Sequence, residues 1–514
     1  MTALIIHGHF YQPPRENPWT GAIDPEPSAA PFHDWNERVH AECYQPNSAA
    51  LILDEKSGQE LIVNNYANVS FDFGPTLLWW LERQHPETYA SILAADAQSL
   101  ERHGGHGNAI AQAYNHAILP LCNERDRRTQ VLWGLADFRH RFGRESESIW
   151  LPETACNDDV LDLLIDERLR FVILAPLQAK RIRSGESADW QSIPAGSVDT
   201  SVPYRCLHRD GSGRSIAVFF YDQRISHAIA FERALTSSRA LVDQFAQQRG
   251  GAGSLVNVAT DGESYGHHHK FGDLCLAHAL EIEAPARGLS LTNYGEYLQQ
   301  HLLMMEVEID SGDDGEGSSW SCVHGVSRWL RDCGCHTGGE SGWNQAWRQP
   351  LREALDYLRD EAASAFEATR GELFRDPWAA RDEAITLVLD QMKSREEFLA
   401  RHAPRELNRE EEQRALLFLE AQRHTLLMYT SCGWFFNDIS GIEPVQILKY
   451  ACRAIEIMVQ LGFPLPRGRF LEILRKAKSN RPEMGTGADI YERLVEPTNP
   501  SAIDVTQTVS LRAG

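Results

Sequence analysis

The sequence of 514 residues lacks the features of membrane-spanning, secreted and nucleic-acid-binding proteins. No stretch approaches the roughly 18 consecutive apolar residues of a membrane span. The amino terminus has a short apolar run with no basic region before it, so we expect no secretory signal. Basic residues are outnumbered, with 50 Lys and Arg against 72 Asp and Glu, and the net charge is −22. We therefore predict neither a nucleic acid nor a membrane as a partner.

Paired cysteine motifs are also missing. Ten cysteines are scattered along the chain without the spacing of a small disulfide-rich domain or of Cys-x-x-Cys zinc motifs. We therefore expect a cytoplasmic protein with reduced thiols. One group, Cys322, Cys333 and Cys335 with His324 nearby, suggests a structural zinc or a redox pair. Free loop thiols are the simpler interpretation, and we predict neither a metal nor a cofactor.

The composition that remains is that of a soluble globular protein, with 42% hydrophobic and 24% charged residues. A chain of this length is expected to form two or three domains. Thirteen tryptophans stand out. Acidic, aromatic-rich proteins often handle sugars, whose C–H faces lie on aromatic rings, although most single tryptophans pack in cores.

Apolar runs of strand length alternate with helical patterns over residues 1–310, which predicts βα units and a parallel sheet or barrel. Residues 311–342 are rich in Gly, Ser, Trp, Cys and His and show no periodicity, so we interpret them as loops lining a cleft. Residues 343–480 have an almost continuous helical pattern and are predicted to form a helical domain. Residues 481–514 lose periodicity and are predicted to be an irregular tail.

Two apolar runs end on acidic residues. The stretch 148–157 runs through Trp150 to Glu153 and then enters a helical pattern, and the stretch 255–269 ends on Asp261 and Glu263 before a glycine loop and three histidines. In parallel α/β folds, ligands and chemistry collect at the carboxyl ends of the strands. We predict that folding brings Glu153 and Asp261 together.

Two such carboxyl groups beside aromatic residues are what glycoside hydrolysis requires. One carboxylate attacks the anomeric carbon, and the other, with a raised pKa, donates its proton to the leaving oxygen. A retaining reaction needs about 5–5.5 Å between the carboxyl groups and an inverting one about 6.5–9.5 Å, a distance that sequence does not give.

Four stretches resemble the motifs of glycoside hydrolase family 57. They are His7-Gly8-His9-Phe10-Tyr11-Gln12-Pro13, residues 74–82, Trp150-Leu151-Pro152-Glu153 and residues 260–267. The resemblance implies an incomplete (β/α)7 barrel followed by a C-terminal helical domain. It also implies a retaining hydrolase or transglycosylase acting on an α-linked oligo- or polysaccharide, of the α-amylase, 4-α-glucanotransferase or branching-enzyme type. Glu153 would then be the nucleophile and Asp261 the general acid/base.

Sugar-binding residues are expected around these acids. The resemblance implies that His7, His9 and His267 hydrogen-bond sugar hydroxyls, and Trp150 and Asp222 stand at expected strand ends. Trp320 is a candidate wall of the cleft. A fifth motif would fall at residues 429–436, where Trp434 remains but Gly433 replaces the acid of the family.

Two alternatives stay open. In the first, His7 and His9 bind a divalent metal together with Asp261 or residues 267–269, and the protein is a metal-dependent carbohydrate deacetylase or another metallohydrolase. In the second, the chain is a non-catalytic glucan-binding protein. Gly433 favours this second alternative, and the pair Glu153 and Asp261 disfavours it because binding alone does not need both.

Overall fold

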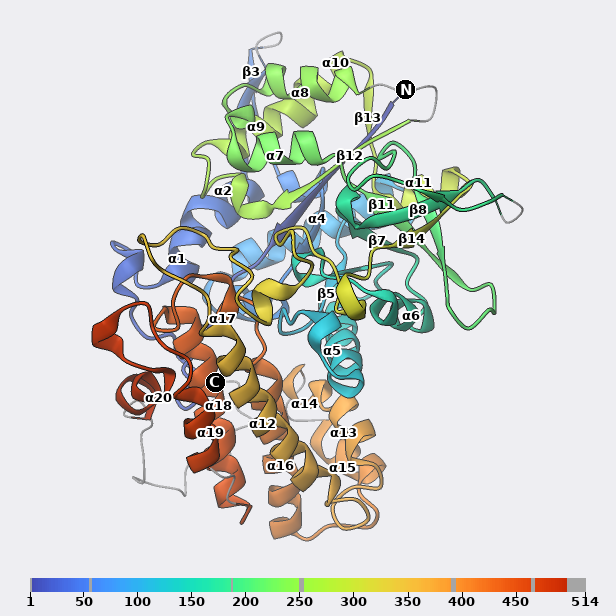
Figure 1. The fold of residues 1–514 in the computed structure, drawn as a ribbon. Helices are drawn as coiled ribbons and strands as arrows, with labels where there is room; N and C mark the ends of the chain where they lie inside the picture. The colour runs from blue at the N-terminus through green and yellow to red at the C-terminus, as the bar shows by residue number, and fades with distance from the viewer. Residues whose placement is uncertain are drawn as a thin grey trace. The chain divides into compact units, whose positions relative to one another are not determined.

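The structure is a computed structural model that describes residues 2–54, 58–185, 188–248, 254–389, 394–463 and 467–496 (Figure 1). These residues divide into two compact units. The first unit holds Met1–Gln12, Pro25–Ala113 and Phe138–Ser321, and the second holds Pro13–Asp24, Tyr114–Asp137 and the described residues from 322 onward. The expected boundaries near residues 310, 342 and 480 stay predictions. The second unit takes in two N-terminal segments that the sequence pattern did not assign to it.

Strand β1 (Thr2–Phe10) is the centre of the first unit's parallel sheet. It pairs with β12 (Leu255–Asp261) on one side and with β13 (Leu289–Leu291) and β4 (Ser70–Phe73) on the other, always in parallel. Strands of such sheets are covered on both faces and therefore read as continuous apolar runs. In β1 that run is interrupted by two buried histidines, His7 and His9.

Parallel pairing continues beyond β4. A bridge between Phe71 and Ala109 leads to β5 (Ala111–Gln112), which pairs with β6 (Ile149–Trp150). A bridge between Ser148 and Phe171 leads to β7 (Phe171–Leu174), which pairs with β11 (Ser215–Phe220). The predicted alternation of parallel strands with helices is confirmed.

Other strands pair outside this parallel series. A mixed extension beyond β11 contains β10 (Tyr204–Leu207), β14 (Met305–Ile309), β8 (Ala179–Arg183) and β9 (Gln191–Ser192). A separate hairpin pairs β2 (Ala50–Asp54) with β3 (Gln59–Val63). After β3, the Asn64 side chain accepts a hydrogen bond from the amide of Tyr66 and starts a 3₁₀ turn, which separates β3 from β4.

Helices α7 (Gln223–Phe231), α8 (Ser238–Gln247) and α9 (Gly272–His278) cover β1 and β12 on one side (Figure 1). Their apolar residues form one core with the strands, which includes Ile225, Phe245, Leu276 and Val258. Helices α7 and α8 are separate, and the Ser237 side chain caps the start of α8. The remaining helices that lie wholly in the first unit are α1 (Trp35–Val39), α2 (Gln45–Ser48), α3 (Pro75–Gln84), α4 (Pro86–Arg102), α6 (Asp158–Asp166), α10 (Ala284–Ala286) and α11 (Tyr294–Gln300).

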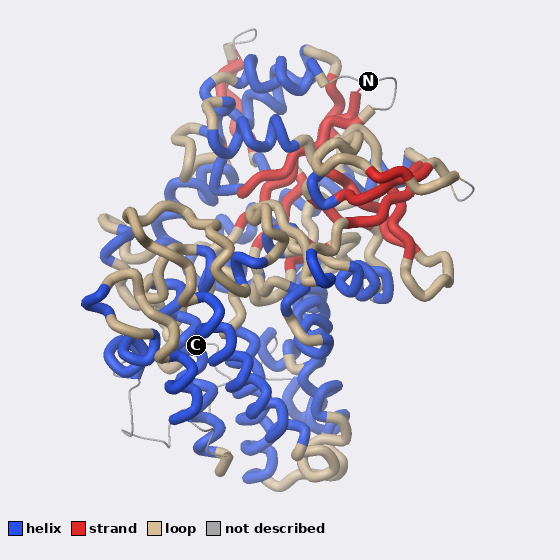
Figure 2. The backbone as a smooth tube through the Cα atoms, in the orientation of Figure 1, coloured by secondary structure: helices blue, strands red, loops and turns tan. Residues whose placement is uncertain are grey.

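The second unit is built of helices and loops, as the helical pattern predicted (Figure 2). Helix α12 (Arg348–Glu367) packs on α16 (Arg409–Leu427) and α19 (Arg467–Leu474), and α16 packs on α18 (Ile442–Gln460). The shorter helices are α13 (Pro377–Glu383), α14 (Ile385–Leu389), α15 (Ser394–His402), α17 (Cys432–Phe435) and α20 (Gly487–Ile490), and α5 (Glu124–Phe142) begins in this unit and ends in the first. No helix within the described ranges is long and apolar enough to cross a membrane.

Candidate active site

The strand register of the first unit places three polar residues in one row. His9 on β1 lies opposite Asp72 on β4 and opposite Asp261 on β12. Residues opposite each other on neighbouring strands point to the same face of a sheet. The row lies at the carboxyl ends of the three strands, the edge at which the sequence predicted the chemistry.

Asp72 joins the two histidines of β1. Its Oδ1 lies 3.0 Å from Nε2 of His7, and its Oδ2 lies 2.8 Å from Nδ1 of His9. Burial lowers the pKa of His7 despite Asp72, so that ring is neutral at pH 7. Burial also disfavours a charge on His9, but the carboxylates of Asp72, Asp261 and Glu263 outweigh it and raise the pKa of His9 to about 9. The row therefore carries one charged imidazole next to Asp261.

Trp150 covers both histidines. Its ring stacks on His7 with centroids 4.8 Å apart and on His9 with centroids 5.0 Å apart. The indole is almost fully buried, and its other neighbour is Trp320, at 5.2 Å in an edge-on arrangement. Trp150 thus fixes the orientation of both imidazoles from the end of β6.

Glu153 follows Trp150 in a strained turn. Its φ is 59° and that of Thr154 is 49°, values that residues other than glycine adopt at a cost and that cluster at functional sites. Its Oε2 accepts hydrogen bonds from Nε1 of Trp320 (3.0 Å) and from the hydroxyl of Ser321 (2.5 Å). Oε1 has no hydrogen-bond partner among the residues that the structure describes. One oxygen of the carboxylate is held and the other is left for a ligand.

Asp261 combines solvent access with a raised pKa. The residue is exposed, yet protein surrounds its carboxyl group closely enough that desolvation raises the pKa to about 7. His9 opposes this shift, and the charges of Glu263 and Glu153 add to it. Glu153 therefore lies near enough to Asp261 for one charge to affect the other. At neutral pH, Asp261 can be protonated while it faces solvent.

Glu263 lies buried behind Asp261. Its Oε1 accepts hydrogen bonds from the amide of Tyr11 (3.0 Å) and the hydroxyl of Tyr44 (2.6 Å), and burial raises its pKa. Sequence reasoning assigned no role to Glu263, Asp72 or Ser321. Asp72 had the same signal as the two predicted acids, an acid near the end of an apolar strand, whereas nothing in the sequence distinguished Ser321.

Two predicted residues bond elsewhere in the first unit. Asp222 caps α7, because its Oδ1 accepts a hydrogen bond from the amide of Ile225 at 2.8 Å. Nδ1 of His267 lies 2.5 Å from Oε2 of Glu42, and its ring meets the edge of Trp35. The next two histidines of the run, 268 and 269, line a separate groove beside α8 and α9. The roles predicted for Asp222 and His267 stay predictions.

Trp434 lies in the second unit and is fully buried there. Its Nε1 donates to the carbonyl of Arg348 at 3.2 Å, and the guanidinium of Arg352 lies 4.6 Å from its ring centroid. A Cβ at Gly433 would lie 2.4 Å from Cδ1 of Ile447, so an acid at that position would require the Ile447 side chain to move. A contact of Trp434 with sugar requires the ring to be uncovered and stays a prediction.

Potential metal ligands gather in two places among the described residues. Glu37, His40 and His85 form one group, and Cys322, His324, Cys333 and Cys335 form the other. His7 and His9 belong to neither group, and their rings lie 3.0 and 2.8 Å from the carboxylate of Asp72. The metallohydrolase alternative built on this histidine pair stays a prediction.

Two family models match the chain, each over a different part. The model of Glycosyl hydrolase family 57 matches residues 26–309, more than half of the chain. A second model, described as a domain of unknown function (DUF3536), matches residues 343–513. Comparison of the sequence with curated proteins gave no match.

Solved structures share the fold at low sequence identity. An exo-type maltose-forming amylase from Pyrococcus sp. ST04 superimposes with a TM-score of 0.64 at 17% identity, over 92% of this chain and 82% of that one. A branching enzyme from Thermococcus kodakaraensis gives 0.53 at 14%, over 94% and 95%. A 4-alpha-glucanotransferase from Thermococcus litoralis gives 0.51 at 16%, over 89% of this chain and 59% of that one.

Proposed function

The chain belongs to glycosyl hydrolase family 57, and from that membership we propose that it cleaves or transfers α-linked glucans by a retaining double displacement. Glu153 is the nucleophile and Asp261 the general acid/base. The observation that carries this assignment is the coupling of the two carboxyl groups. Asp261 has a pKa of about 7, which Glu153 helps to raise, while two donors hold one oxygen of Glu153. Unequal protonation of neighbouring carboxyl groups is what retaining glycosidases need.

In the first step, Oε1 of Glu153 forms a bond to the anomeric carbon as the glycosidic C–O bond breaks. The leaving oxygen takes the proton of Asp261, and the charged His9 stabilises the carboxylate that remains. The product is a glycosyl ester of Glu153.

The ester changes the role of Asp261. Once Glu153 is esterified, it carries no charge, and its contribution to the raised pKa of Asp261 disappears. Asp261 is then a base that takes a proton from water or from a sugar hydroxyl. The deprotonated oxygen attacks the anomeric carbon and releases Glu153. With water the outcome is hydrolysis, and with a sugar acceptor it is transfer or branching.

We further infer that the parallel strands close into an incomplete barrel of the (β/α)7 type. The series β12, β1, β4, β5, β6, β7 and β11 supports it, as does a contact between the two ends of the series. The amide of Asp222 after β11 donates to the carbonyl of Asn257 on β12 at 2.6 Å, and the Asn257 amide group donates to the carbonyl of Phe220 at 3.1 Å. Such a ring of parallel strands, although incomplete as a barrel, places the carboxyl ends of its strands around one opening.

The substrate is an α-linked oligo- or polysaccharide. The named activities of the three solved structures, maltose formation, 4-α-glucanotransfer and branching, support this class. Trp320, which is partly exposed beside Glu153, supplies one wall near the scissile bond. Behind it, the buried rings of Trp150, His7 and His9 hold the row of polar residues in place. No step of this reaction requires Asp222, His267 or Trp434.

Trapping of the covalent intermediate tests the assignment. A fluorinated α-glucosyl donor slows release of the glycosyl enzyme, and peptide mass mapping should find the adduct on Glu153. The matched control is Glu87→Gln, which changes an exposed acid in the first turn of α4 and should be labelled like the unaltered protein. An adduct on another residue, or none with an active preparation, contradicts the proposal. Products from maltooligosaccharides and glycogen then separate hydrolysis, chain redistribution and branching.

A further inference from the structure

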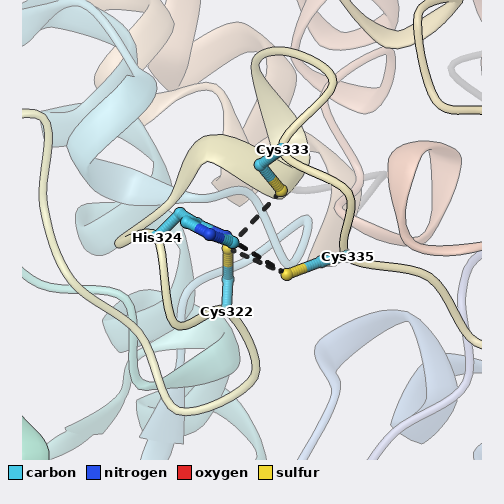
Figure 3. A group of neighbouring side chains, drawn as sticks. All are labelled: Cys322, His324, Cys333 and Cys335. Atoms are coloured by element: carbon cyan, nitrogen blue, oxygen red, sulfur yellow. Dashed lines mark hydrogen bonds between the residues drawn. The ribbon is translucent and has the colours of Figure 1, made fainter.

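We propose that Cys322, His324, Cys333 and Cys335 bind one structural zinc ion in the second unit (Figure 3). The four side chains come from a single loop, and Figure 3 shows them pointing toward one another from two turns of it. Their ligand atoms all lie within 4.8 Å of one another. Three cysteines and one histidine are a frequent ligand set of structural zinc sites.

The distances match a tetrahedron around zinc. Sγ of Cys322 lies 3.8 Å from the sulfurs of both Cys333 and Cys335, and Sγ of Cys335 lies 3.5 Å from Nδ1 of His324. Zn–S bonds of about 2.3 Å and Zn–N bonds of about 2.0–2.1 Å place the ligand atoms of a tetrahedral site about 3.8 Å (S···S) and 3.5–3.6 Å (S···N) apart. A disulfide needs about 2.05 Å, and the equal distances from Cys322 to two other sulfurs select no pair.

The loop is shaped to bring the ligands back to one point. Gly325 and Gly334 have φ values of 74° and 77°, which only glycine adopts without strain. Gly325 directly follows His324, and Gly334 lies between Cys333 and Cys335.

Two buried arginines balance the charge of the site. Zinc with three thiolates and one neutral imidazole has a net charge of −1. The guanidinium of Arg348 is fully buried and donates to the carbonyls of Cys335, Phe435 and Phe436. Arg328, also buried, lies over the ring of Phe435. Within the described ranges neither arginine forms an ion pair with a carboxylate, although the charge of Asp332 acts on Arg348, so the zinc site and Asp332 together offset the buried positive charge.

The ion would hold this loop on α12. Arg352 of that helix donates to the carbonyl of Trp329 at 2.7 Å, and Trp329 is fully buried. Val326 is the other large apolar side chain that the loop buries between its ligands. Since so few side chains form a core here, a metal cross-link is the stabilising element that the loop lacks.

Metal analysis of the full chain, purified without a metal-binding tag, tests the site. We expect one equivalent of zinc, its loss in Cys322→Ser and His324→Ala, and a lower thermal midpoint in both variants. His336→Ala is the matched control, because His336 is exposed and directly follows Cys335. His85→Ala tests the other group of potential ligands and should keep the zinc. Zinc lost from His85→Ala but retained by Cys322→Ser overturns the proposal.

Thiol titration keeps the test valid if a variant does not fold. In the zinc-loaded native chain, Cys322, Cys333 and Cys335 should be protected from a thiol reagent, and a chelator should release three reactive thiols together with one metal ion. Replacement by Co²⁺ should give the visible absorption of a tetrahedral thiolate site. A native chain that binds no added Zn²⁺ or Co²⁺, or whose mass shows a disulfide among these cysteines, overturns the assignment.

Discussion

The strand-end site of the first unit and the cysteine–histidine group of the second collect polar side chains in opposite ways. The strand-end site joins residues between positions 7 and 321, and the register of parallel strands aligns three of them. The cysteine–histidine group comes from residues 322–335 alone. One site exists only when the whole sheet has formed, whereas the other needs little more than two turns.

The two sites also treat charge differently. At the strand ends, desolvation and, after it, the negative charge of the neighbouring carboxylates raise the pKa of Asp261 to about 7, and His9 is a charged imidazole beside them. In the second unit, we propose that zinc neutralises most of the charge of the cysteines. The first arrangement keeps a proton available at a cost in stability, which is typical of catalysis, and the second contributes stability.

Glu153→Gln should have the largest effect on activity of all the variants and should leave the zinc site unchanged. We expect kcat on maltooligosaccharides to fall by about 10⁶-fold, the order of effect that loss of the nucleophilic serine has in a serine protease. The amide keeps the shape of the side chain, so zinc content and thermal midpoint should stay at the values of the unaltered protein. Activity that survives undiminished would remove Glu153 from the mechanism.

Asp261→Asn should have the next largest effect. Loss of a general acid costs about 10²–10⁴-fold, and less with donors whose leaving group needs no proton. In the unaltered protein, kcat/KM should fall as pH rises through about 7, because Asp261 loses the proton that it must donate. That limb should be missing from the pH profile of the variant. The same limb in both proteins would assign the acid to another residue.

Local sequence was enough to find β12, which ends on Asp261, and the short β6, which ends three residues before Glu153, since buried parallel strands are apolar runs and an acid follows closely in both cases. It was not enough to find the partner of the histidines. Asp72 has the same pattern, but only the sheet register places it against His7 and His9. Sequence also carries no signal for the exposure of a single side chain, which is why it did not separate the enclosed Trp434 from the partly exposed Trp320.

For the cysteine–histidine group, the sequence showed that the residues are close along the chain but not that their side chains meet. All its members lie close together in the sequence, yet their spacing matches no paired zinc motif and the simpler interpretation was free thiols. The deciding feature is the backbone path at Gly325 and Gly334. Nearness in sequence does not give convergence of side chains.

Ser321→Ala should reveal how the nucleophile is positioned. The hydroxyl makes one of two hydrogen bonds to Oε2 of Glu153, and a bond to a charged group contributes about 1.5–3 kcal/mol, so we expect kcat to fall roughly 10- to 100-fold. KM should change little, because Ser321 acts on Glu153. Ser238→Ala is a suitable control, since that partly buried hydroxyl bonds to His278 instead. An equal fall in both variants would point to general destabilisation.

The smallest effect concerns stability, and its dependence on pH should have opposite signs at the two sites. The pKa of Asp261 is about 7 in the folded chain and about 3.9 in the unfolded chain. The folded state therefore holds this proton more tightly, and the stabilisation is complete below pH 4 and lost as pH rises to 7. Asp261→Asn should gain in thermal midpoint relative to the unaltered protein over that interval.

Zinc binding requires thiolates and a neutral imidazole, so its contribution should increase with pH. In the presence of zinc, the deficit of Cys322→Ser relative to the unaltered protein should therefore widen as pH rises, while Asp261→Asn moves the other way. Thermal midpoints of the three proteins between pH 4 and 8, with Glu87→Gln as a control acid, test both signs in one series. Parallel curves for Asp261→Asn and the unaltered protein would mean that the pKa of Asp261 is not raised in the folded chain. Asp261 would then lack the raised pKa that a general acid needs at neutral pH.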